Sequence, residues 1–169
     1  SNTETKRRCF ETLADVLKQT TQPMIERNIP VAAINGMRIL RPNAQAGAKQ
    51  SALLEDCLDT LWTFYQRRSG QSEQQVQSHV PPAIAELLEN SATDTTVYKD
   101  HFVDLLAGKL GKKHISQYQS AALALGLLAQ PRELDSDQAK YSDALLRYSQ
   151  TGKNEQARYF ALMAMAKIG

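Results

Sequence analysis

Three histidines, His79, His101 and His114, carry the side chains of this sequence that could bind a metal ion or move a proton at neutral pH. Helical metal sites place their histidines at short fixed spacings, as in H-E-x-x-H, and no such spacing links these three. Each also falls on a different expected element. We therefore interpret them as solvated or helix-capping side chains, and the sequence predicts neither a metal nor a cofactor.

Two groups of carboxylates could supply a general acid and a general base. Glu55, Asp56 and Asp59 form the first group, and Asp100 and Asp104 form the second. Acid–base work would require one member to be buried, because burial moves a carboxyl pKa toward neutrality. Spacings of three and four residues are common on the exposed face of a helix, so we interpret both groups as solvent-facing.

The two cysteines offer a further kind of chemistry. Cys9 follows the basic run 6–8, and nearby cations lower the pKa of a thiol, so a reactive thiolate is one interpretation. Cys9 and Cys57 lie far apart without a C-x-x-C motif, which leaves a single bridge open but indicates no zinc site. We favour small apolar fillers of helix packing for both, because free Cys is among the most buried residue types.

Motifs for covalent hydrolysis and nucleotide binding do not occur. The chain contains no G-x-S-x-G, no G-x-x-x-x-G-K-[ST] and no G-x-G-x-x-G. Together with the scattered histidines and carboxylates, this predicts that the protein is not an enzyme.

An aromatic and basic group near the end of an expected helix could bind a partner. It comprises Trp62, Tyr65, Arg67 and Arg68, a composition common at interaction hot spots. In the alternative interpretation the two rings belong to the core. The arginines then complement the negative end of the helix dipole.

A basic turn is the second candidate for partner binding. Lys109, Lys112 and Lys113 precede His114, and together they could meet phosphate or an acidic partner. The alternative is again a set of charges that complements the C-terminus of the preceding helix.

The elements that would position these residues are helices. Apolar spacing and helix breakers predict four pairs, over residues 6–40, 47–90, 96–129 and 137–168. The stretch 71–78 is too polar to assign and is either a loop or the frayed start of a helix at Pro81-Pro82. Thr93-Asp94-Thr95 offers an N-cap for a helix over residues 96–110, with Gly111 as its stop.

Composition agrees with a helical chain. Hydrophobic residues make up 42% of the 169 residues and aromatics only 7%, so Ala and Leu dominate the apolar side, which suits helix packing better than a β-sandwich. The formal net charge of +2 provides no strong field for nucleic acid or a membrane surface. No run of about 18 apolar residues occurs, so we expect a soluble protein without a membrane span.

A 40-residue repeat decides the expected fold. Leu105-Leu106 recur as Leu145-Leu146, and the small-apolar pattern of residues 121–129 recurs over residues 161–169. Ala and Gly in such a pattern let neighbouring helices approach closely. A fainter copy covers residues 30–40.

The pattern Ala-Ala-x-Ala-Leu-Gly over residues 121–126 resembles the second helix of HEAT repeats. The resemblance implies an all-α, HEAT-like α-solenoid of about four antiparallel helix pairs with a right-handed superhelix, forming one repeat domain over residues 1–169. An irregular helical bundle is the alternative. The resemblance is clearest over residues 96–169 and weak over residues 1–90.

The two ends of the chain carry a further expectation. Ser1-Asn2 in place of Met suggests a cloning remnant, and Gly169 follows directly on a helix that a further repeat would normally cover. We therefore expect a piece of a longer protein, or self-association through the uncapped C-terminal repeat. The compartment stays open between the cytoplasm and, if a leader was removed, the periplasm or the exterior.

The functional expectation follows from the HEAT-like resemblance. It implies a non-catalytic scaffold that binds a protein or peptide partner along its helices. Two alternatives rest on the same resemblance: a nucleic-acid-binding solenoid similar to certain DNA-repair glycosylases, which the balanced charge disfavours, and a bilin-lyase-like protein, by fold analogy alone.

Overall fold

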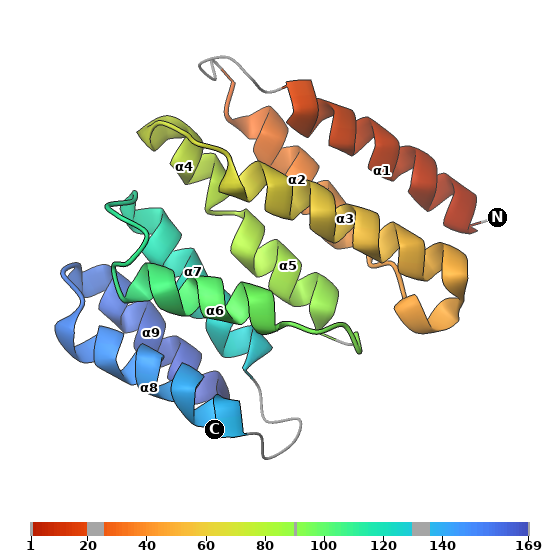
Figure 1. Cartoon of the computed structure of the whole chain (residues 1–169). Coiled ribbons are helices and arrows are strands. Elements are labelled where there is room, and N and C mark those ends of the chain that lie inside the picture. Colours follow the sequence, from red (N-terminus) through yellow and green to blue (C-terminus); the bar gives the residue numbers. More distant parts are fainter. Residues whose placement is uncertain (1, 20–25, 90, 130–135, 169) are drawn as a thin grey trace. The chain divides into compact units, whose positions relative to one another are not determined.

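The computed structural model describes residues 2–19, 26–89, 91–129 and 136–168, in which helices joined by turns and loops are found and no strand (Figure 1). The all-α fold class is therefore confirmed. Two compact units divide the chain, one over residues 1–91 and the other over residues 92–169.

The first unit consists of two helical hairpins. Helices α1 (Asn2–Gln19) and α2 (Asn28–Leu40) form the first hairpin. After a short 3-10 turn at Ala44–Ala46, α3 (Ala48–Gln66) is followed by α4 (Gln71–Gln77) and α5 (Val80–Leu88). First helix packs on first and second on second, since α1 contacts α3 and α2 contacts α5.

The core of this unit follows the predicted stripes. Leu54, Leu58, Leu61 and Tyr65 of α3 are all buried. Full burial of one such aliphatic side chain stabilises the fold by about 1.5–3 kcal/mol relative to leaving it in water. The fully buried aliphatic side chains from the other helices include Leu17, Ile34, Met37, Ile84 and Leu88.

Residues 71–77 of the polar stretch form a separate helix, α4, so the stretch is neither a loop nor the start of α5, and it closes the end of α3. The amide nitrogen of buried Gln77 donates to the carbonyl oxygens of Phe64 at 2.9 Å and Arg67 at 3.1 Å. The Ser69 hydroxyl donates to the Gln77 amide oxygen at 2.7 Å. The last carbonyls of a helix lack partners within the helix, so Gln77 provides what α3 needs at this end.

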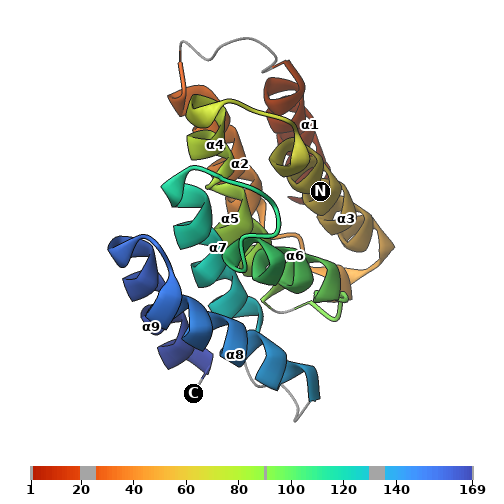
Figure 2. The ribbon, with the colours of Figure 1, turned by 60° about the vertical axis from the view of Figure 1, so that its left-hand side comes forward.

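The second unit repeats the two-hairpin plan. Its first hairpin is α6 (Thr96–Leu106) with α7 (Ile115–Leu128), and its second is α8 (Ser136–Thr151) with α9 (Glu155–Ile168). Figure 2 shows α6 beside α8 and α7 beside α9, and these pairs pack against each other.

Helix α6 ends four residues before the predicted Leu110, and Gly108 rather than Gly111 closes it. Gly108 has a φ of 76°, which a residue with a side chain rarely adopts. The Gly108 amide donates to Leu105 O and the Lys109 amide to Asp104 O, both at 3.0 Å. These two bonds form a Schellman motif that satisfies the last carbonyls of the helix.

The contact between α7 and α9 is unusually close. A Cβ placed on Gly126 would lie 2.6 Å from the Cβ of Ala164 and 2.8 Å from its Cα. Only glycine leaves room for the backbone of α9 here. Ala157, Ala161 and Ala164 are buried on the α9 side, as the small-residue pattern predicts.

Within each unit, like helices of successive hairpins therefore pack on one another, which is the contact that stacked repeats make. The four-pair solenoid, its right-handed superhelix and the single repeat domain over residues 1–169 stay predictions. None of the described helices is long and apolar enough to cross a membrane.

Candidate functional site

The aromatic and basic group at the end of α3 is largely engaged within its own unit. Tyr65 is buried, and half-buried Trp62 stacks on it with 5.5 Å between ring centroids. Arg67 donates from its guanidinium to Leu17 O at 2.9 Å and so links the ends of α1 and α3. Arg68 is the exposed member of the group. Burial also raises the pKa of the Tyr65 phenol, which keeps it neutral.

The basic turn after α6 is also used by the fold. Lys109 pairs with Asp104 at 2.7 Å, and the backbone amide of Lys113 donates to the Tyr118 hydroxyl at 3.3 Å. The side chain of His114 accepts from the Ser116 amide at 3.3 Å, which confirms the capping interpretation for this histidine. Lys112 and the side chain of Lys113 are exposed. The turn belongs to the second unit and the Trp62 group to the first.

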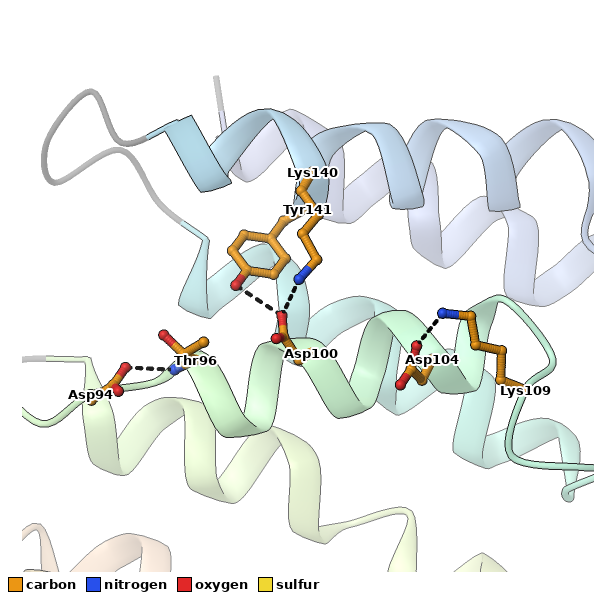
Figure 3. A network of polar contacts seen from close by, with 7 residues as sticks. All are labelled: Asp94, Thr96, Asp100, Asp104, Lys109, Lys140 and Tyr141. Carbon is orange, nitrogen blue, oxygen red and sulfur yellow. Dashed lines mark hydrogen bonds and ion pairs between the residues drawn. The ribbon is translucent and has the colours of Figure 1, made fainter.

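Both side chains of the second carboxylate group are partly exposed, Asp100 by 43% and Asp104 by 42%, and α8 packs on α6 beside Asp100 (Figure 3). The ammonium of Lys140 donates to Asp100 Oδ1 at 2.7 Å, and the hydroxyl of buried Tyr141 donates to the same oxygen at 3.1 Å. The Lys140 hydrogen bond is the main reason that the pKa of Asp100 is lowered. A carboxylate held ionised in this way suits a structural link between two helices better than proton transfer at neutral pH.

The first carboxylate group is exposed, as predicted. Asp56 forms an ion pair with Arg7, which joins α3 to α1. Among the described residues, no group of three His, Cys, Asp or Glu side chains is placed to hold a metal ion.

The two cysteines differ in burial, and only Cys57 fits the predicted role of a buried apolar filler. Cys57 is buried in α3, and burial raises the pKa of its thiol to about 12. Cys9 is exposed, so its interpretation as a buried filler is wrong; it lies on the side of α1 that faces away from the core, next to buried Phe10. Both thiols are free, and the single bridge left open by the sequence is not formed.

The outer face of α9 carries an apolar surface that was not among the predicted candidate sites. Tyr159, Leu162 and Met163 are 56%, 49% and 57% exposed. They lie on one side of the helix with exposed Ala166, at spacings of three, four and seven residues. We call these four residues the outer stripe of α9. Large apolar side chains that gather on one exposed face mark interaction surfaces more often than single exposed ones do.

The 40-residue repeat in the sequence relates the outer stripe of α9 to a face of α7. The outer stripe corresponds, residue for residue, to positions 119, 122, 123 and 126 of α7. In α7 this face receives α9, since Gly126 lies against Ala164. By the 40-residue shift, the outer stripe corresponds to the side of α7 on which Gly126 contacts α9, and none of the described helices covers the stripe. The 40-residue shift in the sequence relates the outer stripe to α7. The shift predicts a packing face only together with the side of α7 that contacts its neighbour, which the structure provides.

Charged residues lie at both ends of the stripe. Glu155 begins α9 and Lys167 lies in its last turn, and both are exposed. The Tyr159 hydroxyl donates to Glu155 Oε1 at 3.0 Å, and this hydrogen bond is the main reason that the pKa of Tyr159 is raised.

Comparisons of the chain with protein-family models, with curated proteins and with solved structures find no match. The site is therefore interpreted from its own geometry.

Proposed function

We propose that this protein is a non-catalytic scaffold of HEAT-like helical hairpins that binds a protein partner through the outer stripe of α9. The observation that carries the proposal is the exposure of Tyr159, Leu162 and Met163 on a face whose counterpart in α7 is a helix-packing face. An α-helix is the partner that fits such a face, because the corresponding face of α7 packs against a helix.

The composition of the stripe supports the proposal. Tyr and Met are enriched in the cores of protein interfaces, whereas Lys and Glu are depleted there and lie at the rim. The stripe has this distribution, with apolar residues in the middle and Glu155 and Lys167 at the two ends.

The nucleic-acid and bilin-lyase alternatives have less support. Lys109 is paired with Asp104, and the chain as a whole is close to neutral. Phosphate-driven binding would need several free cations on one face. The bilin-lyase alternative rests on fold analogy alone.

Site-specific photo-crosslinking tests the proposal. A photoreactive amino acid replaces Met163 in one version of the full chain and Ile39 in a matched control. Ile39 is 72% exposed on α2 and lies outside the stripe. We expect position 163, and not position 39, to crosslink reproducibly to a helical segment of one protein, either another protein of the source cell or a second copy of this chain. Equal and low yields at the two positions would contradict the proposal.

A further inference from the structure

The side chains of the outer stripe differ in size from those of the corresponding face of α7, and this difference restricts which partner can pack on the stripe. At the stacking face of α7 the four positions hold Gln119, Ala122, Leu123 and Gly126, and the last of these permits contact with the α9 backbone. The outer stripe has larger residues at three of these positions, with Tyr159 for Gln119, Leu162 for Ala122 and Ala166 for Gly126, and Met163 is similar in size to Leu123. A helix that packs on it must therefore stand farther away and interdigitate with it through ridges and grooves.

The α9 helix of a second copy cannot dock through its small-residue face as the next repeat would. The next repeat would present small residues like Ala157, Ala161 and Ala164, and in α9 these are already buried against α7. The face of α9 that a second copy can still offer is the outer stripe itself. An interface made by the same surface on both partners closes on itself through a two-fold axis.

The two charged residues at the ends of the outer stripe, Glu155 and Lys167, are placed as such an axis requires. Glu155, Tyr159, Met163 and Lys167 follow one another at four-residue spacing and form a single ridge along α9. The ridge is antisymmetric about its midpoint, with an acid at one end and a base at the other. When two such ridges pack antiparallel, Glu155 of one copy meets Lys167 of the second, and Tyr159 of one copy meets Met163 of the second.

We propose that a second copy of this chain occupies the outer stripe, with the two α9 helices antiparallel across a two-fold axis near residue 161 and with the ion pair from Glu155 to Lys167 formed twice. This inference rests on the proposed function, because it names the partner of the same face. A parallel arrangement would place Glu155 beside Glu155 and Lys167 beside Lys167, where like charges repel.

The interface in this arrangement is small. With four apolar side chains from each copy and two ion pairs in all, we expect it to bury less than the roughly 800 Å² per partner of a standard interface and the dimer to be reversible. Its dissociation constant should lie in the range of roughly 10 µM to 1 mM.

Sedimentation velocity of the full chain over this concentration range tests the inference through a charge swap. Glu155→Lys and Lys167→Glu each bring like charges together, so each should weaken the dimer at least tenfold. The double variant reverses both signs and should restore it to near the wild-type strength. A wild-type chain that stays monomeric throughout, single variants without effect, or a double variant no better than the singles would each overturn the inference.

Disulfide trapping provides a second readout that is independent of the charges. Leu162 lies one residue from the proposed axis, so Leu162→Cys in a Cys9→Ser background should crosslink to Leu162→Cys of a second copy. Ile39→Cys in the same background is the matched control, because it is exposed outside the stripe. Crosslinking of the control at an equal rate would overturn the inference.

The proposed function can survive the failure of this inference. A monomeric chain whose position 163 crosslinks to a different protein would retain the function and exclude the second copy. A position 163 that crosslinks no better than position 39 would remove both.

Discussion

Helices α7 and α9 hold equivalent places in their hairpins, yet one carries a neighbour on a face that the other leaves exposed. Ala122 and Gly126 of α7 are buried, whereas Leu162 and Ala166, forty residues later, are exposed. The two helices have the same length and the same small-residue pattern. The difference teaches that one pattern of small and apolar residues can lie in the core on one helix and at the surface on another, depending on which helices surround it.

The largest effect should come from filling the space between the two helices. Gly126→Leu would place a side chain against the Ala164 backbone and should cost about 3 kcal/mol of unfolding free energy, since overpacking forces the helices apart. Ala166→Leu is the matched variant at the equivalent position of α9, and it should change stability by less than about 0.5 kcal/mol because the site is exposed. Urea unfolding followed by circular dichroism measures both. Similar losses for the two variants would mean that the faces are not different.

The next effect concerns association rather than folding. Leu162→Ser combined with Met163→Ser removes the middle of the outer stripe and should weaken self-association at least tenfold, while leaving the thermal midpoint nearly unchanged because both side chains are exposed. Ile39→Ser on α2 is the control and should leave association intact. Light scattering at several concentrations provides the measurement. A stripe variant that associates like the control would show that α9 is not the surface.

The smallest effect tests the other layer of the second unit, where α6 and α8 are linked by Asp100 and Lys140. The pKa of Asp100 is lowered in the folded protein, so this carboxylate stabilises the fold above its ordinary pKa of 3.8 and loses that contribution as the pH falls through the folded value. The two side chains are 43% and 49% exposed, so the contribution should stay below about 1 kcal/mol.

Asp100→Asn should remove this part of the acid sensitivity. Asp104→Asn, which breaks an ion pair within one helix end instead, serves as the comparison. Thermal unfolding between pH 2 and 6 separates the two. An Asp100→Asn variant with the wild-type pH dependence would show that the link contributes nothing.

The helices and their inward faces could be predicted from the sequence because they depend on local spacing. Leu54, Leu58 and Leu61 lie on one face by their positions alone, and Ala161 and Ala164 are small where close packing requires it. The end of a helix is harder to predict where two residues that can terminate it follow each other closely. Gly108 and Gly111 both follow α6, and the one that completes the Schellman motif closes the helix.

The contacts of the candidate site residues could not be predicted because they cross between elements. Arg67 reaches Leu17, fifty residues away, and Asp100 reaches Lys140 on the next hairpin. Gln77 is polar and yet buried, since the carbonyls that it satisfies belong to the preceding helix. The outer stripe is exposed because no helix among the described residues covers it. The residue pattern of α9 itself does not predict whether another helix packs on this face.

The methyl signals of the methionines provide the most direct test of the central claim. In ¹³C-methyl NMR spectra of the wild-type chain, the signal of Met163 should shift as the protein concentration rises, because a second copy covers it. The signal of Met37, buried in α2, should stay fixed. A Met163 signal that does not move from about 10 µM to 1 mM, the range in which a small interface should assemble, would contradict the account.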